Sequence, residues 1–305
     1  MKFSNNKYFT YISESYLPIR TISEDENNVS LSEFRSAYFP NVVNNYSIKL
    51  TLNGVENYKI NKKEFKVPEM CFLTASGPCE SVGYIESKSL VTGLCIDISL
   101  NIINEALTIL SVNEDVDLEN NLAGYFKSEK FFENVYPVNH TELGTKLLSI
   151  SEKFKSAAHD LSFINREMFL ELAESVIRHE FENLRKLNSL SSLKISTKKE
   201  ILKRLFQGKN FIDDNFKEKI DVKDIARISC LSEFHFFRSF KEAFGISPHN
   251  YLIKKRLNEA QKLLQNDNSS IGETAFICGV ADIHSFSKSF KKHFGQSPSR
   301  VLMKN

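Results

Sequence analysis

Apolar and polar side chains alternate in short segments over the first hundred residues. Residues 46–52 alternate strictly, and the Asn53-Gly54 pair after them is a strong hairpin signal, so residues 55–60 are expected to return antiparallel to them. A second turn is expected at Asn61-Lys62, with further short strands at 64–67, 70–74 and 89–99. Closely spaced antiparallel strands predict a small barrel or jelly roll, with residues 1 to about 20 as an arm outside it.

After residue 100 the apolar positions recur at helical spacing. Helices are expected at 102–112, 141–160 and 164–187, and the second and third carry apolar stripes that include Leu147 and Phe169. Such stripes either cover the core of the barrel or form a dimer seam, and periodicity alone does not choose between them. The Ser-rich stretch 187–197 has the composition of a linker.

The last third of the chain contains an internal repeat. A short helix from residue 222, a turn at Cys230-Leu231 and a second helix between an N-cap at Ser232 and Gly245 predict a helix-turn-helix unit at 222–244. The same arrangement returns at 271–294, with its second helix expected at 281–294. The two units match with a shift of 49 before the turn and 50 after it, so the second unit carries one extra residue. A linker helix from Pro248 to about residue 265 joins them.

Helical geometry divides the second helix of each unit into two faces. At about 100° per residue, Phe236, Phe240 and Phe244 share one side, as do Phe286, Phe290 and Phe294, and both stripes are expected in the core. The opposite faces carry groups that suit base edges and phosphates. They are Phe234, His235, Arg238 and Glu242 in the first unit and His284, Ser285, Lys288 and Lys292 in the second.

Glu242 has two interpretations. It could accept a hydrogen bond from cytosine, or pair with Arg238 at the i, i+4 spacing. Phe234 could touch a thymine methyl group, and Arg238 could donate to guanine.

Length and charge support a chain of two parts. A chain of 305 residues exceeds one ordinary core. Residues 198–305 hold 20 Lys and Arg against 12 Asp and Glu, whereas residues 1–197 hold 20 against 26. A basic end on an acidic body suggests a polyanion as partner, although a solvated charged face would look the same. The sequence has no apolar run of about 18 residues and no signal-peptide pattern, which predicts a cytoplasmic protein without a membrane partner.

The sequence offers little support for an enzyme. All seven histidines lie at or after residue 140, which excludes a histidine-based metal site in the barrel, and no phosphate-binding glycine loop or G-x-S-x-G elbow is present. We therefore expect no catalytic residues, no cofactor and no metal. The five cysteines stand far apart, which predicts reduced structural thiols, with a thiol sensor as the less favoured alternative.

Three motifs carry a family resemblance. They are I-A-x-x-x-x-x-S at Ile225 to Ser232, F-K-x-x-F-G-x-S-P at Phe240 to Pro248, and F-S-K-x-F-K-K-x-F-G-x-S-P at Phe286 to Pro298. Residues 198–305 resemble the DNA-binding domain of the AraC family of bacterial transcription regulators. The resemblance implies a cupin-like sensing barrel with dimerising helices before it. The family's base-reading positions fall on Phe234, His235, Phe237 and Arg238 and on Ile283, His284, Ser285 and Lys288.

The resulting prediction is an α+β protein with four parts: a cupin-like effector-sensing barrel at 1–110, a helical region at 111–190 that is a candidate for dimerisation, a linker at 191–197 and the DNA-binding domain at 198–305. We expect a sequence-specific, effector-responsive transcription regulator that inserts two recognition helices into adjacent major grooves of promoter DNA, where it associates with the nucleoid. Expected partners are a second copy of the chain, an unknown small molecule and, for an activator, RNA polymerase. A sequence-indifferent nucleoid binder is the alternative.

Two further expectations concern individual residues. Because Phe237 and Ile283 cannot hydrogen-bond a base, the second recognition helix is expected to read sequence weakly and to anchor the backbone through Lys288 and Lys292. Candidate pocket residues in the barrel are equally expected to be plain core and receive no role. They are Tyr38, Tyr46, Tyr58, Phe72 and Cys95.

Overall fold

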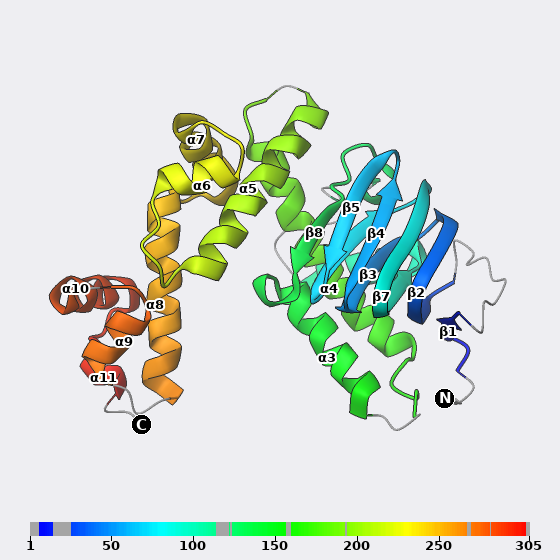
Figure 1. The fold of residues 1–305 in the computed structure, drawn as a ribbon, viewed down its shortest axis with the longest axis horizontal. Coiled ribbons are helices and arrows are strands. Elements are labelled where there is room, and N and C mark those ends of the chain that lie inside the picture. Colours follow the sequence, from blue (N-terminus) through cyan, green and yellow to red (C-terminus); the bar gives the residue numbers. More distant parts are fainter. Residues whose placement is uncertain are drawn as a thin grey trace. The chain divides into compact units, whose positions relative to one another are not determined.

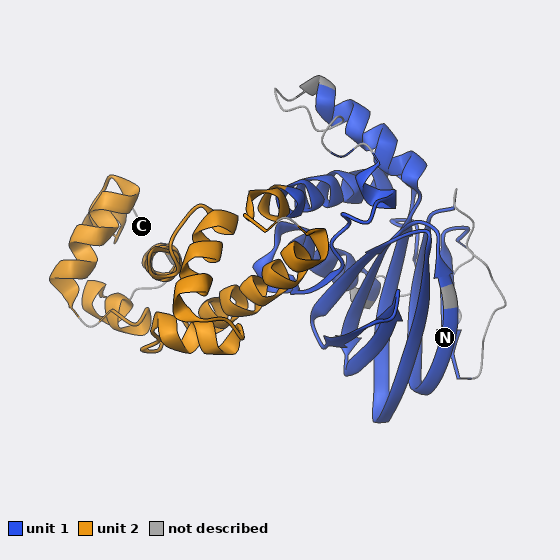
Figure 2. Ribbon diagram, turned by 90° about the horizontal axis from the view of Figure 1, so that it is seen from above, with its two compact units in different colours: residues 1–184 blue, residues 185–305 orange. Residues whose placement is uncertain are grey.

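A computed structural model gives the fold (Figure 1) and describes residues 6–14, 26–113, 122, 124–156, 160–192, 194–266, 270–280 and 282–302. The chain divides into two units, Met1–Leu184 and Arg185–Asn305, coloured separately in Figure 2. The first is a β-sheet with helices and the second is all helical, which confirms the predicted α+β class. In the described residues no helix is both long and apolar enough to cross a membrane.

The described residues of unit 1 form one bent sheet of eight strands. The hydrogen-bonded order is β1-β2-β7-β3-β6-β8, with β4 paired to β7 and to β5. All pairs are antiparallel except β1 with β2, which run parallel. The strands are β1 (Phe9–Ser13), β2 (Asn28–Val43), β3 (Tyr46–Asn53), β4 (Val55–Ile60), β5 (Lys63–Pro68), β6 (Cys71–Ser76), β7 (Cys79–Ile98) and β8 (Asn134–Pro137). Residues 9–13, expected in an outer arm, are therefore part of the sheet.

The predicted hairpin at Asn53-Gly54 is wrong. Instead of pairing with each other, β3 and β4 run one after the other along β7, β3 against its second half and β4 against its first half. Gly54, with φ 84°, allows a bend there, and the 20-residue β7 is long enough to pair with both strands. The real hairpin is β4–β5, whose turn residues Asn61 and Lys62 both have positive φ, as a two-residue type I′ turn requires.

Helices of unit 1 bury their apolar stripes within the same chain. Leu147 on α3 (Glu142–Ser156) and Phe169 on α4 (Arg166–Ser189) are fully buried. Hydrogen bonds tie α4 to the sheet, because Tyr46 Oη donates to Glu180 at 2.8 Å and Asn183 donates to Tyr136 Oη at 3.0 Å. The stripes therefore cover the core. Among the described residues, unit 1 also contains α1 (Leu100–Asn113) and two 3₁₀ turns, Tyr125–Lys127 and Val138–His140.

Unit 2 contains both predicted helix-turn-helix units. The first consists of α6 (Val222–Ile228) and α7 (Glu233–Phe244), and the second of α9 (Ile271–Ile277) and α10 (Ile283–Phe294). Between them lies α8 (Pro248–Asn266), the predicted linker helix. The unit also contains α5 (Ile195–Asn215) and α11 (Pro298–Leu302). The connector between α4 and α5 overlaps the stretch expected as a linker, although α5 already begins at Ile195.

The two turns have the same backbone geometry. Cys230 in the first and Gly279 in the second have φ of 51° and 75°, and the next residue donates its N–H to the carbonyl of Ala226 or Ala275 at 3.0 and 2.9 Å. One residue separates Cys230 from the N-cap of α7, whereas two separate Gly279 from the N-cap of α10. The extra residue is thus placed as predicted, but α10 begins at residue 283 rather than 281.

Gly279 provides a test of this turn. A Cβ there would lie against the backbone carbonyl of Lys217, and the positive φ adds strain for an L-residue. We expect Gly279→Ala to destabilise unit 2 by more than the roughly 1–2 kcal/mol of a left-handed non-glycine residue, measured as a lower Tm. Gly295→Ala is the matched control, since Gly295 has φ 72° with open space around its Cβ position. Equal losses in the two variants would contradict the steric argument.

Candidate functional sites

The first recognition helix, α7, presents the predicted face. Ser232 caps it by accepting the His235 N–H at 3.3 Å, and Gly245 ends it with φ 70°. Phe236 and Phe240 are fully buried. On the other side Phe234 is 78% exposed, and Phe237, His235 and Arg238 are also exposed. Burial of the phenylalanine stripe therefore fixes which side chains α7 can offer to a partner.

Glu242 holds Arg238 in this structure. Arg238 Nε donates to Glu242 Oε1 at 3.0 Å. The other carboxylate oxygen accepts from the Ser191 N–H at 3.3 Å and its hydroxyl at 3.4 Å. Partial burial opposes ionisation, but these hydrogen bonds outweigh it and lower the pKa of Glu242. The i, i+4 interpretation of Glu242 thus describes the geometry, and the carboxylate orients the guanidinium rather than standing free for a base.

The second recognition helix, α10, has the same construction. Asp282 caps it by accepting the N–H groups of His284 and Ser285 at 3.1 and 3.0 Å. Phe286 and Phe290 are buried on one side. On the exposed side lie Ile283, His284, Ser285, Lys288 and Lys292.

Packing behind the two helices is equivalent. The Phe240 and Phe244 rings lie 4.5 Å apart and the Phe290 and Phe294 rings 4.6 Å apart, at interplanar angles of 46° and 54°. The internal repeat is therefore structural, and it places the two exposed faces at equivalent positions of their units.

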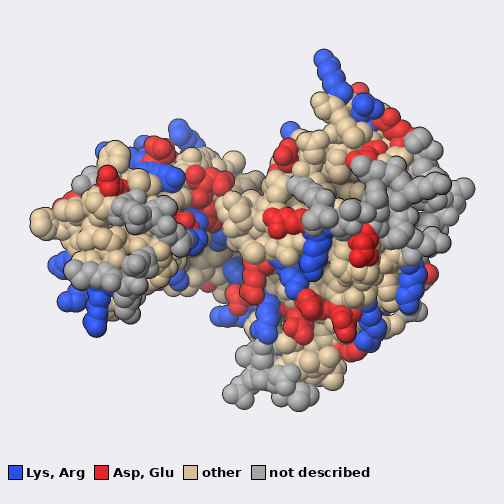
Figure 3. Space-filling view, turned by 90° about the horizontal axis from the view of Figure 1, so that it is seen from below, with Lys and Arg blue, Asp and Glu red and all other residues tan. Residues whose placement is uncertain are grey.

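Charge on unit 2 is mixed. On the face of the molecule in Figure 3, Lys and Arg side chains are interspersed with Asp and Glu. The excess of Lys and Arg in residues 198–305 thus forms no single continuous basic patch on that face.

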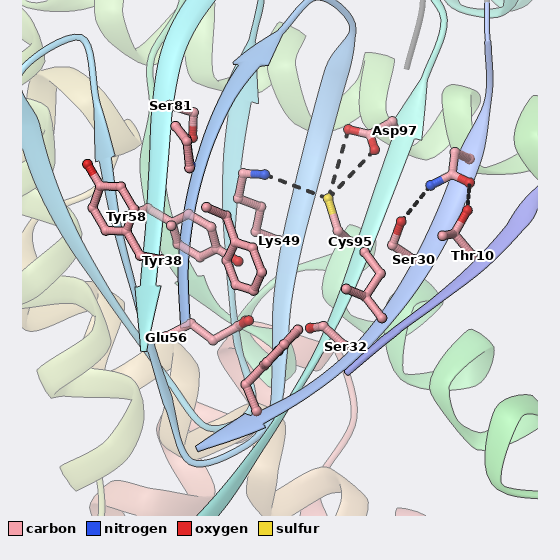
Figure 4. A pocket seen from close by; sticks show the side chains of 16 residues that line it. Thr10, Ser30, Ser32, Tyr38, Lys49, Glu56, Tyr58, Ser81, Cys95 and Asp97 are labelled. Atoms are coloured by element: carbon pink, nitrogen blue, oxygen red, sulfur yellow. Dashed lines mark hydrogen bonds between the residues drawn. The ribbon is translucent and has the colours of Figure 1, made fainter. Parts of the chain in front are cut away.

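A cavity of about 310 Å³ lies against the sheet of unit 1. Figure 4 shows polar side chains that reach it from several strands. Along β3, side chains alternate between the two faces of the sheet. Tyr46, Ile48 and Leu50 are buried on the face toward the helices, and Lys49 faces the cavity. The lining comprises charged Lys49, Glu56 and Asp97, polar Thr10, Asn28, Ser30, Ser32, Tyr38, Tyr58, Ser81 and Cys95, and apolar Ile12, Phe34, Phe39, Pro40 and Gly83.

Burial shapes the charges in the cavity. It raises the pKa of Glu56 and of Asp97. Burial acts against the Lys49 ammonium, but the nearby Cys95, Asp97 and Glu56 outweigh it and raise the pKa of Lys49. Burial and Asp97 also raise the pKa of Cys95 to about 11. The Cys95 thiol therefore stays protonated at neutral pH, which argues against a redox-sensing role for it.

Some of the residues that line this cavity were candidates from the sequence alone. Of the five aromatic and thiol candidates, Tyr38, Tyr58 and Cys95 line it, whereas Tyr46 and Phe72 are core. The charged lining residues Lys49, Glu56 and Asp97 were not among the sequence-based candidates. The available signal was the regular strand alternation itself, because Lys49 and Asp97 stand at the polar positions of segments whose apolar positions are all large.

Comparisons with known proteins agree on the C-terminal part. A family model described as a helix-turn-helix domain matches residues 225–304. The probable transcriptional regulator LumQ of Photobacterium leiognathi is 26% identical over 160 residues, covering 49% of this chain and 64% of that protein. The bifunctional transcriptional activator/DNA repair enzyme AdaA of Bacillus subtilis is 38% identical over 90 residues, or 30% of this chain and 43% of that protein.

A solved structure is also similar to part of the chain. It is a transcriptional regulator from Chromobacterium violaceum, described as one of the proteins that contain an AraC-type DNA-binding domain. The sequence identity is 29% and the TM-score 0.32, and the match covers 33% of this chain and 90% of that one. The chain spans less than two thirds of the length of each of these two curated relatives. Residues 225–304 thus form a helix-turn-helix domain, in agreement with the AraC-family resemblance seen in the sequence.

Proposed function

We propose that this protein is a sequence-specific DNA-binding transcription regulator that places α7 and α10 in two adjacent major grooves of promoter DNA. The pair of equivalent exposed faces, each fixed by a buried phenylalanine pair, carries the proposal. The linker helix α8 has 19 residues, a length of roughly 28 Å at about 1.5 Å per residue. Successive major-groove faces lie about 34 Å apart, a spacing that helices joined by such a linker suit.

The side chains suggest different roles for the two helices. Arg238 is the base-contact candidate on α7, since a guanidinium oriented by Glu242 can donate to guanine, and exposed Phe234 suits a thymine methyl group. His235 can bond a base edge or a phosphate. On α10, Lys288 and Lys292 suit phosphates, whereas His284 and Ser285 supply the polar reading groups and Ile283 only an apolar contact.

Regulation by a small molecule is the second part of the proposal. The cavity of unit 1 offers a place for an effector, and such sites are concave with a few convergent polar groups. The names of the curated relatives include both regulators and activators, which supports activation and hence RNA polymerase as a partner. A homodimer in the cytoplasm remains part of the proposal. Its interface would use surfaces other than the buried stripes of α3 and α4.

Sequence-indifferent DNA binding is the second candidate. The net positive charge of residues 198–305 favours it. Two chemically distinct exposed faces and interspersed acidic side chains favour the regulator. Selecting bound sequences from a randomised DNA pool with the full chain distinguishes the two functions. A regulator should enrich one sequence motif, and its binding to that motif should persist in the presence of excess random DNA.

Arg238→Ala should weaken binding to the selected motif by roughly 10- to 100-fold and relax the preference at one base position. Lys292→Ala should weaken binding to selected and random DNA alike and reduce the salt dependence. Gel-shift titrations at two salt concentrations measure both effects. Lys88→Ala, an exposed lysine on the sheet of unit 1, is the control and should change nothing. Unchanged affinity for both recognition-helix variants would refute the assignment of the interface.

A further inference from the structure

We propose that Ser191, in the connector between α4 and α5, is a positioning residue for DNA reading. It holds the Glu242 carboxylate, which in turn holds the Arg238 guanidinium in place for guanine. The inference rests on the proposed function, in which Arg238 is the base-contact residue of α7. Ser191 lies outside both helix-turn-helix units, two residues after α4 ends at Ser189. The preference for one base then depends on the connector.

Three hydrogen bonds converge on the Glu242 carboxylate. One oxygen accepts from Arg238 Nε at 3.0 Å, and the other accepts from the Ser191 N–H at 3.3 Å and from the Ser191 hydroxyl at 3.4 Å. The Glu242 side chain is 23% exposed, whereas that of Arg238 is 59% exposed. The carboxylate is thus a partly buried bridge whose two oxygens bind different segments of the chain, and the guanidinium is the end of the bridge that meets solvent.

This division of the two oxygens leaves the reading atoms of Arg238 available. Among the described residues, the guanidinium makes one hydrogen bond, through Nε. The N–H groups of its two terminal nitrogens are therefore left for a partner outside the chain, and they match the O6 and N7 acceptors of guanine. Because Nε is tied to Glu242, fewer rotamers of the arginine remain to be frozen when DNA binds.

The bonds from Ser191 decide how firmly this carboxylate is fixed. Without them, one oxygen of Glu242 would have no partner among the described residues, and only the long side chain of Arg238 would restrain the other. The chain around Ser191 is itself anchored, because the preceding Leu190 is 3% exposed and α5 begins at Ile195. A carboxylate bound to such a segment supports the guanidinium better than one bound to the guanidinium alone.

The second helix-turn-helix unit lacks this arrangement. With the shift of 50 that relates the two recognition helices, Arg238 and Glu242 correspond to Lys288 and Lys292. One lysine cannot hold another through its ammonium group, which only donates hydrogen bonds. The carboxylate bridge is therefore a property of α7 and not a requirement of the helix-turn-helix fold, which favours a role in reading over a purely structural one.

The test measures base preference with the full chain. A motif selected from a randomised DNA pool is compared in gel-shift titrations with the same motif changed at the base position that Arg238→Ala relaxes. Ser191→Ala should lower the ratio of the two affinities by about three- to tenfold, the usual effect of having to immobilise one long side chain on binding. Ser189→Ala is the matched control and should leave the ratio unchanged, because the Ser189 hydroxyl donates to the Lys186 carbonyl within α4 at 2.8 Å.

A double variant separates positioning from folding. In a Glu242→Ala chain the carboxylate that Ser191 holds is gone, so adding Ser191→Ala should lower the ratio by less than about twofold. An equal effect of Ser191→Ala with and without Glu242 would overturn the inference. So would an equal loss of affinity for both DNA sequences, since Ser191 would then act through the stability of unit 2.

The same titrations distinguish this inference from the proposed function. If Arg238→Ala relaxes one base position and Ser191→Ala leaves the ratio unchanged, only the role of Ser191 is refuted. If the chain selects no motif, or Arg238→Ala relaxes none of its positions, the proposed function itself fails.

Discussion

Replacing Phe240 by alanine should destabilise unit 2 by about 3–5 kcal/mol, the usual cost of deleting a fully buried aromatic side chain. Phe240 is completely buried, and its ring centre lies 5.3 Å from that of Phe236, 4.5 Å from Phe244 and 5.7 Å from Tyr251. The substitution therefore removes the contacts that join α7 to α8. Calorimetry of the full chain should show that the unfolding transition of unit 2 moves to a markedly lower temperature. DNA binding should be lost as well.

Phe234→Ala is the matched control, because Phe234 lies on the same helix and is largely exposed. Its Tm should stay within about 1 °C of the original chain, since exposed substitutions usually change stability by less than about 0.5 kcal/mol. DNA binding should still weaken if Phe234 touches a base. Similar losses of Tm in the two variants would contradict the division of α7 into a buried and a reading face.

Glu180→Gln should stabilise unit 1 at pH 8 by up to roughly 3 kcal/mol. Glu180 is fully buried beneath β3, and burial raises its pKa from 4.5 to about 7, although hydrogen bonds from Tyr46, Asn183 and Tyr125 act in the opposite direction. The folded chain thus keeps a proton that the unfolded chain releases above about pH 4.5. The contribution of this group to stability is present below that pH, falls as the pH rises toward 7 and is lost above it.

A glutamine keeps an acceptor for the Tyr46 hydroxyl, which lies 2.8 Å from the carboxylate, and removes the ionisation. Denaturant titrations at pH 5, 7 and 8.5 should therefore show a gap between variant and original chain that widens with pH. Glu167→Gln, at an exposed position on the same helix, should show no such gap. A gap of constant size would mean that the substitution acts through packing rather than through the proton.

Local signals explain why the helix-turn-helix units could be predicted almost residue by residue. The N-cap at Ser232, the left-handed Gly245 and the phenylalanine spacing each specify structure over a few residues. Only the start of α10 was misplaced, by two residues, because Asp282 rather than an earlier residue accepts the first N–H groups. The DNA-facing residues follow from the same periodicity, since whatever lies opposite the buried stripe must be exposed.

Strand pairing in unit 1 could not be predicted from such local signals. Asn53-Gly54 is a turn signal in isolation, yet the chain continues there along β7 (Cys79–Ile98), because this more distant strand pairs with both β3 and β4 and competes with the local hairpin. Strand pairing depends on such distant partners, which no local pattern identifies.

The sequence by itself determined the class of the fold, the two helix-turn-helix units and their exposed faces, because helices and caps are specified by neighbours within a few residues. Only the tertiary structure decided that the polar positions of β3 and β7 line a cavity instead of a flat, solvent-exposed surface. Lys49 and Asp97 would alternate with large apolar residues in the sequence whether their side chains lined a cavity or faced solvent. Which side of a strand meets solvent depends on how the sheet bends and which strands cover it, a property of the whole unit.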